Sequence, residues 1–101
     1  MQQTTDILTF ATRGSGLTEI TGDLSGWLAG KGMQQGLLTL FCRHTSASLL
    51  IQENAAPEVR GDIVDWLARL APENGHYRHA DEGPDDMPAH LKAVLTGINL
   101  Q

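Results

Sequence analysis

The sequence predicts an α+β domain covering residues 1–101, in which a sheet of antiparallel or mixed strands carries about three helices. Two observations support this class. Segments whose apolar residues alternate with polar ones lie between segments whose apolar residues recur every three or four positions. Clusters of Gly, Pro and small polar residues separate these segments, as is typical of turns. A chain of 101 residues can bury one small core.

Three strands are expected, over residues 6–13, 36–43 and 47–54. The second is the clearest, because alternate residues of its apolar face are Leu38, Leu40 and Cys42. The dipeptide TS separates the second strand's continuation from the third strand, so a tight hairpin and a bulged continuous strand both fit. Three or four strands are too few to complete a sandwich. Further strands or a partner chain are therefore expected to cover the sheet.

Helical periodicity marks the first two helices. The first helix has an apolar stripe and ends at a glycine-rich stretch; the stripe consists of Leu17, Ile20, Leu24, Trp27 and Leu28. The second begins near Pro57, because proline favours the first helical position, and stops at Pro72. Trp66 lies in the middle of the second helix's stripe, so we expect Trp66 to be buried more firmly than Trp27.

The third helix is expected over residues 86–97. Asp86 is expected to cap it, Pro88 lies in its first turn, and Gly97 ends it. His90 falls on the apolar side of this helix. The preceding polar segment, residues 73–85, is predicted to be a loop of the kind that often carries function.

Composition excludes several classes of function. The net charge is -5, with seven scattered Lys and Arg residues, which argues against nucleic-acid binding. No apolar run reaches the roughly 20 residues of a membrane span, and the N-terminal sequence lacks the features of a signal peptide. The single Cys42 fits a reducing compartment. These features together predict a cytoplasmic protein.

The four histidines are the main candidates for chemistry. His44 continues the apolar face of the second strand, and His90 lies on the inner side of the last helix. His76 and His79 lie in the polar loop. Imidazole is a common metal ligand, but the spacing of these residues matches no local metal motif, and His44 and His90 also fit hydrogen-bonded core residues. The acidic run DEGPDD fits a metal site or a solvated turn, and it lacks the EF-hand spacing.

Several motifs together resemble the YjbQ family. They are HTSASLLIQENAAPEVRGD, followed by WLARLAP, YRHADEGPDDMPAH and LKAVLTG. The resemblance implies an α+β fold based on a β-sandwich-like sheet, assembled as a homotrimer, with a polar pocket that holds a metal ion or an anion. The family positions map onto His44, Thr45, Ser46, Glu53, Asn54, Arg60, Asp62, His79 and His90. Family members continue past the LTG motif with further strands, so the resemblance implies a domain that is incomplete at its C-terminus.

The resemblance also implies an activity, that of a secondary thiamine-phosphate synthase, which joins a pyrimidine diphosphate to a thiazole phosphate and releases diphosphate. The catalytic residues would be His44, Glu53 and His79. The residues that bind the small phosphorylated metabolite would be Thr45, Ser46, Asn54, Arg60 and Asp62. A divalent metal, with zinc favoured over magnesium, would be held by His44, His79 and His90. A non-catalytic trimeric module that binds a metal or an anion, or a metal-dependent hydrolase of a small metabolite, would use the same residue types.

Overall fold

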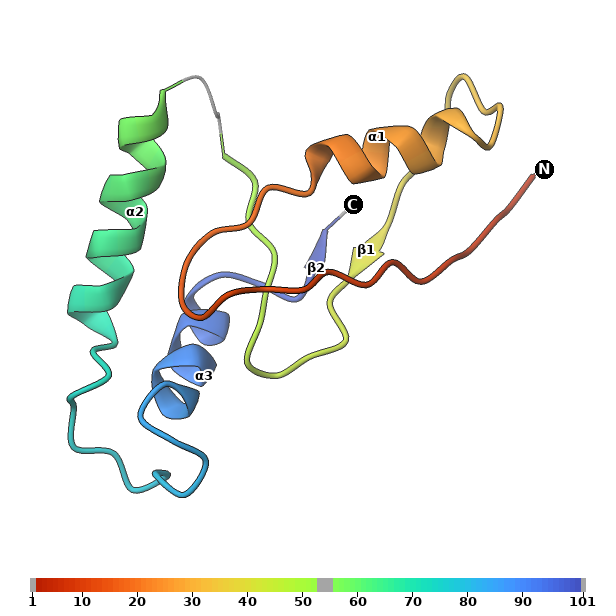
Figure 1. The fold of residues 1–101 in the computed structure, drawn as a ribbon. Helices are drawn as coiled ribbons and strands as arrows, with labels where there is room; N and C mark the ends of the chain where they lie inside the picture. The colour runs from red at the N-terminus through yellow and green to blue at the C-terminus, as the bar shows by residue number, and fades with distance from the viewer. Residues whose placement is uncertain (1, 53–55, 101) are drawn as a thin grey trace. The chain divides into compact units, whose positions relative to one another are not determined.

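The computed structural model describes residues 2–52 and 56–100 (Figure 1). Its elements follow in the order α1 (Thr21–Ala29), β1 (Leu40–Phe41), α2 (Pro57–Leu70), α3 (Asp86–Leu95) and β2 (Asn99–Leu100). The chain divides into two compact units, residues 1–37 and 38–101, which are described separately below. Within the described residues, three helices and a small antiparallel sheet confirm the α+β class.

The first unit contains α1. Its apolar stripe is partly buried as predicted. The ring of Trp27 makes contacts with one acidic and one basic side chain. The indole Nε1–H donates to Asp6 Oδ2 at 3.0 Å, and Lys31 Nζ lies 5.1 Å from the ring centroid. The strand predicted over residues 6–13 does not form, which corrects that expectation. Alternation alone cannot make a strand, since its backbone groups also need a paired neighbour.

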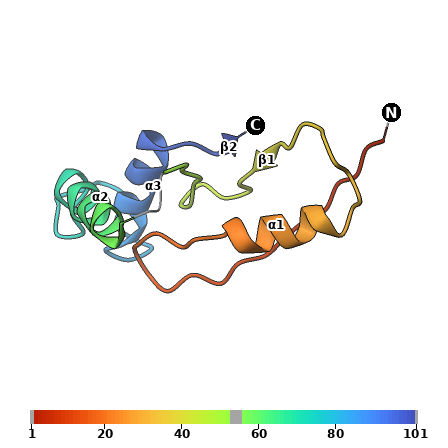
Figure 2. The same ribbon diagram turned by 90° about the horizontal axis from the view of Figure 1, so that it is seen from above.

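The second unit contains a two-stranded antiparallel sheet, and Figures 1 and 2 both show β2 beside β1. Leu40 pairs with Leu100, and Phe41 pairs with Asn99. The backbone N–H of Cys42 donates to the Ile98 carbonyl at 2.6 Å, which extends the contact between the two segments. The strand predicted over 36–43 thus shortens to β1, and residues 47–52 form no strand. A complete sandwich remains a prediction.

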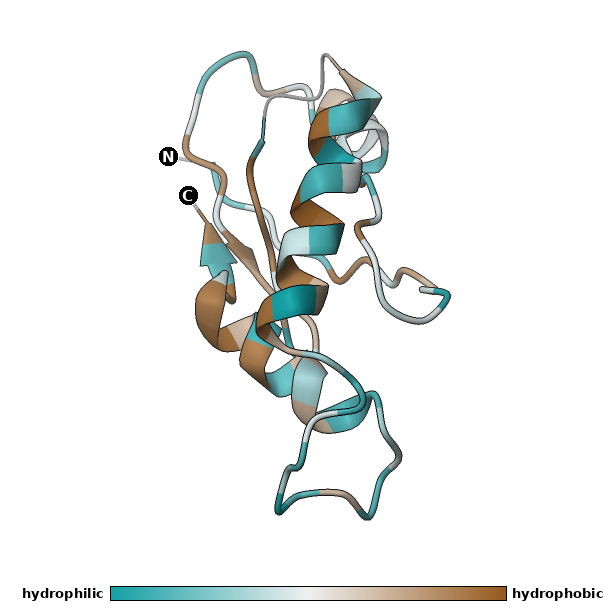
Figure 3. Ribbon diagram, turned by 90° about the vertical axis from the view of Figure 1, so that its left-hand side faces the viewer, coloured by the Kyte–Doolittle hydropathy of each residue, from teal (hydrophilic) through white to brown (hydrophobic). Residues whose placement is uncertain are grey.

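Helix α2 begins at Pro57 as expected, and apolar and polar bands alternate along it (Figure 3). Leu67 is its buried residue, at 8% exposure, and Ala71 just after the helix is 1% exposed. Trp66 is 50% exposed, so the prediction that Trp66 would be a firmly buried residue is wrong. The helical period identified a stripe, but the described residues pack against only part of it.

Helix α3 begins at Asp86 and follows Asp85 in the N-cap position, where no side-chain cap is formed. The expectation that Asp86 caps the helix is therefore wrong, because its carboxylate faces two histidines instead. Pro88 is fully buried in the first turn. The helix ends before Gly97, with the Thr96 hydroxyl donating to the Lys92 carbonyl at 2.9 Å and also contacting the Ser48 hydroxyl.

None of the helices within residues 2–52 and 56–100 is both long enough and apolar enough to cross a membrane.

Candidate metal centre

His79, Asp86 and His90 form a compact group of potential metal ligands. One ligand atom from each side chain lies within 4.8 Å of the other two. Asp86 and His90 are four residues apart on α3, so they share one face of that helix. His79 comes from the loop between α2 and α3. The sequence therefore builds the group from a single helix and the loop that leads into it.

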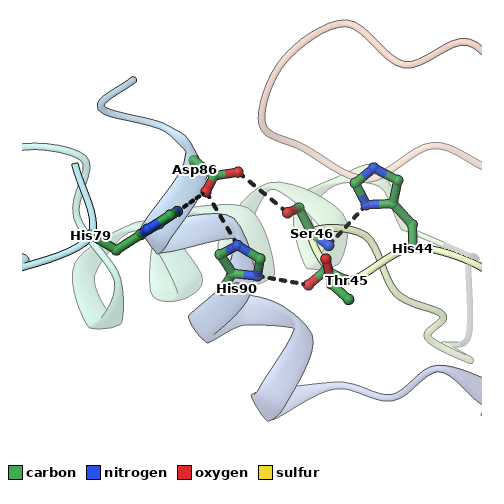
Figure 4. Close-up of polar contacts among 6 residues, drawn as sticks. All are labelled: His44, Thr45, Ser46, His79, Asp86 and His90. Atoms are coloured by element: carbon green, nitrogen blue, oxygen red, sulfur yellow. Dashed lines mark hydrogen bonds and ion pairs between the residues drawn. The ribbon is translucent and has the colours of Figure 1, made fainter. Parts of the chain in front are cut away.

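One carboxylate oxygen joins the two imidazoles (Figure 4). Asp86 Oδ2 lies 2.6 Å from His79 Nε2 and 3.2 Å from His90 Nε2. The two rings meet edge to face, with their centroids 5.7 Å apart. The Asp86 side chain is 17% exposed, against 45% for His79 and 32% for His90. The group is thus reachable from solvent, while its acidic member is the most protected.

A short turn that follows β1 in the chain makes further contacts with Asp86 and His90. The Ser46 hydroxyl donates to Asp86 Oδ1 at 3.4 Å, and His90 Nδ1 lies 3.1 Å from the Thr45 carbonyl oxygen. A carbonyl oxygen only accepts, so Nδ1 of His90 must carry the hydrogen. The neutral ring then presents the Nε2 lone pair to Asp86 Oδ2, which is favourable only with a proton or a cation between them.

The two neighbouring histidines lower the pKa of Asp86. The main cause is the hydrogen bond from His79, with smaller contributions from the charge and hydrogen bond of His90. Partial burial acts in the opposite direction. The carboxylate is therefore the form that this environment favours, as a metal ligand requires.

The structure places His44 outside this group. Its Nδ1 accepts a hydrogen bond from the backbone N–H of Ser46 at 2.8 Å, and Ser46 lies between His44 and Asp86 in Figure 4. Of the predicted ligands His44, His79 and His90, the structure brings His79 and His90 together with Asp86, and His44 is not part of that group. His44 also lines a shallow cavity of about 380 Å³, together with Phe41, Cys42, Arg43, Thr45 and Ile98.

The other predicted site residues are divided. Thr45 and Ser46 contact the group of His79, Asp86 and His90, through a carbonyl and a hydroxyl respectively. Arg60 and Asp62 lie in the first half of α2 and take no part in the contacts given above. Glu53 and Asn54 lie outside the described residues. His76 is an exposed loop residue, as its polar surroundings predicted.

The sequence pattern assigns Asp86 a capping role and not a ligand role, because an acidic residue at the start of a helix commonly interacts with the free N–H groups of that end. A signal for a ligand was nevertheless present. Asp86 and His90 have the i, i+4 spacing that places two ligands on one helical face, as in helical metal motifs. His79 seven residues earlier completes a two-histidine, one-carboxylate set.

Fold and site define an α+β protein with a partly exposed group of two histidines and one aspartate. The model of the UPF0047 protein YjbQ-like family matches residues 6–101, and the chain belongs to this family. UPF0047 protein sll1880 of Synechocystis is 47% identical over 96 residues, which are 94% of this chain and 65% of the relative. UPF0047 protein YjbQ of Escherichia coli O157:H7 is 40% identical over 94 residues, 92% of this chain and 68% of the relative.

Solved structures show the same relationship. A YjbQ/UPF0047 family protein from Clostridium acetobutylicum has a TM-score of 0.78 and 32% identity, over 90% of this chain and 69% of that one. The conserved hypothetical protein TT1486 from Thermus thermophilus has a TM-score of 0.72 and 37% identity, over 88% and 67% of the two chains. The chain thus spans about two thirds of the length of these relatives.

These relatives correct the expected activity. They are named as UPF0047 proteins, and the Clostridium acetobutylicum structure is described as that of an uncharacterized conserved protein. Family membership therefore carries no thiamine-phosphate synthase activity to this chain, and that prediction is wrong. The candidate site must be interpreted from its own geometry.

Proposed function

We propose that the protein binds a divalent metal ion through His79 Nε2, Asp86 Oδ2 and His90 Nε2. The observation that carries this proposal is the convergence of two imidazole nitrogens on one carboxylate oxygen, at 2.6 and 3.2 Å. Without a metal ion, a proton must lie between the ring nitrogen and the carboxylate oxygen in each of these two contacts. A metal ion replaces those protons with direct bonds to all three ligands.

The distances suit a zinc-sized ion after a small adjustment. Tetrahedral ligands about 2.0 Å from zinc lie roughly 3.3 Å from one another. Asp86 and His90 already have this spacing, at 3.2 Å, whereas His79 must move away from Asp86 by several tenths of an ångström. His79 lies on a loop and is 45% exposed, so it has room to move. Zinc suits a ligand set of two imidazoles and one carboxylate better than magnesium does.

The surroundings support the same ligand roles. Metal-bound histidines usually donate their other ring N–H to a carbonyl or carboxylate, and the Thr45 carbonyl accepts from His90 in this way. The Ser46 hydroxyl holds the carboxylate oxygen of Asp86 that faces away from the histidines. Three protein ligands leave at least one position open, which water or an anionic group of a small phosphorylated metabolite can occupy.

Variants at the three ligands test the proposal against neighbouring controls. After EDTA treatment and dialysis, zinc is titrated into the wild type and into His79→Ala, Asp86→Asn and His90→Ala. We expect about one tight site per chain in the wild type and a large loss of affinity in each variant, because each removes one of three bonds. His76→Ala and Asp85→Asn are the controls, since they alter the same loop and retain the ligands. Equal binding by all six proteins would contradict the proposal.

Assembly and location are part of the proposed biology. The structure leaves many large apolar side chains exposed, including Leu37 at 80% and Val94 at 82%. We propose a homotrimer in which partner chains cover such side chains and complete a sandwich-like sheet. We also propose a cytoplasmic location, since a free thiol such as that of Cys42 is typical of a protein in a reducing compartment.

A further inference from the structure

We propose that His44 is a positioning residue of the metal centre, which acts by holding the turn of residues 44–46 rather than by binding the metal. The inference rests on the proposed metal function of His79, Asp86 and His90. It follows from three linked contacts, all within the unit of residues 38–101.

The first contact closes the turn. His44 Nδ1 accepts the backbone N–H of Ser46, two residues later, at 2.8 Å. Asn and Asp side chains close the same kind of turn through a side-chain oxygen two bonds from Cβ. His44 uses a ring nitrogen at the equivalent place. This role requires that Nδ1 carries no hydrogen, so a neutral ring holds its hydrogen on Nε2.

The other two contacts lead from the turn to the ligands. The Thr45 carbonyl accepts from His90 Nδ1 at 3.1 Å, across 45 residues of sequence. The Ser46 hydroxyl donates to Asp86 Oδ1 at 3.4 Å, across 40 residues. The turn therefore contacts two of the three proposed ligands, and Figure 4 shows Ser46 between His44 and Asp86.

The contact with His90 determines which ring nitrogen can bind a metal. A free imidazole exchanges its hydrogen between Nδ1 and Nε2, and only the nitrogen without hydrogen can be a ligand. The Thr45 carbonyl keeps a hydrogen on Nδ1, so Nε2, which faces Asp86, is the nitrogen that can exchange its proton for a metal ion. When the turn opens, this constraint is lost together with the support of the Asp86 carboxylate.

Two substitutions at His44 separate positioning from ligation. Asn retains an acceptor at the place of Nδ1, whereas Leu has a comparable volume and no acceptor. We expect His44→Leu to weaken zinc binding by roughly 10–100-fold, the usual effect of losing an outer partner. The zinc affinity of His44→Asn should stay within about threefold of the wild-type affinity, because the Asn side chain keeps the outer partner. His44 is exposed, so neither change removes a buried side chain; Ser46→Ala, which removes only the hydroxyl contact, should give a smaller loss.

A measurement without metal separates this inference from the proposed function. Nitrogen-15 NMR of the imidazoles should show that His90 Nδ1 carries a hydrogen in the metal-free wild type and in His44→Asn, whether or not Nε2 is also protonated by its contact with Asp86. In His44→Leu, the hydrogen on His90 Nδ1 should be only partly retained, because the Thr45 carbonyl no longer holds it. An unchanged His90 in His44→Leu overturns the inference even if no zinc binds. If His44→Asn loses zinc as fully as His44→Leu, the imidazole itself is needed, and the inference is also overturned.

Discussion

At the scale of single residues, Asp86 determines what the site can do. A first-turn aspartate normally interacts with the free N–H groups of its own helix. Here Oδ2 faces His79 and His90, and Oδ1 accepts from Ser46. The carboxylate thus joins a loop, a helix and a turn that are distant in sequence. Among the contacts given above, those of Asp86 are the only ones by which one described residue reaches both His79 and His90.

Acid should remove the stability that Asp86 provides. Its pKa is lowered in the folded protein, chiefly by the His79 hydrogen bond, so folding favours the carboxylate. This contribution is fully present above the ordinary Asp pKa of 3.8 and disappears as the pH falls through the lowered folded value. In metal-free buffer, the difference in Tm between the wild type and Asp86→Asn should therefore be larger at neutral pH than under strongly acidic conditions. A difference that does not change with pH would contradict this account of the pair.

At the scale of secondary structure, the sequence predicted helices better than strands. Proline positions and apolar periods located the ends of α2 and α3 to within about two residues. This succeeds because helix hydrogen bonds are local, so residues close in sequence determine where a helix begins and ends. Strand hydrogen bonds need a distant partner, which alternation does not specify. For this reason β1 forms where the chain returns after α3, and residues 6–13 do not form a strand.

The candidate site shows the same division. His79, His90, Thr45 and Ser46 were predicted as site residues and lie in one network. The place of His44 could not be predicted, because continuing the face of a strand through His44 assumed a regular strand. The chain instead turns at residues 44–46, and the ring closes that turn.

The packing of α2 leads to a prediction about stability. Leu67 is 8% exposed and Trp66 is 50% exposed. We expect Leu67→Ala to cost about 2–5 kcal/mol of unfolding free energy, since it removes buried methyl groups and leaves a cavity. Trp66→Ala should cost less. Urea midpoints of the two variants test this order, and a larger loss for Trp66→Ala would show that a surface absent from the structure buries the indole.

At the scale of the whole molecule, the exposed apolar side chains indicate association. Several lie in the unit of residues 38–101, such as Phe41 at 62% and Ile51 at 71% exposure. Burial of such side chains typically contributes about 1.5–3 kcal/mol each, so a partner surface would be strongly favoured. Light scattering coupled to gel filtration should give a mass near three times 10.9 kDa. A stable monomer at micromolar concentration would contradict the trimer.

The most direct measurement is anomalous diffraction at the zinc absorption edge from crystals of the zinc-loaded protein. The account predicts one strong peak among His79 Nε2, Asp86 Oδ2 and His90 Nε2, with metal–ligand distances of about 2.0–2.2 Å. His44 should remain hydrogen-bonded to the Ser46 backbone and away from the peak. Zinc found at His44 or at other residues, or crystals with no peak at these three side chains, would contradict the assignment of the metal centre.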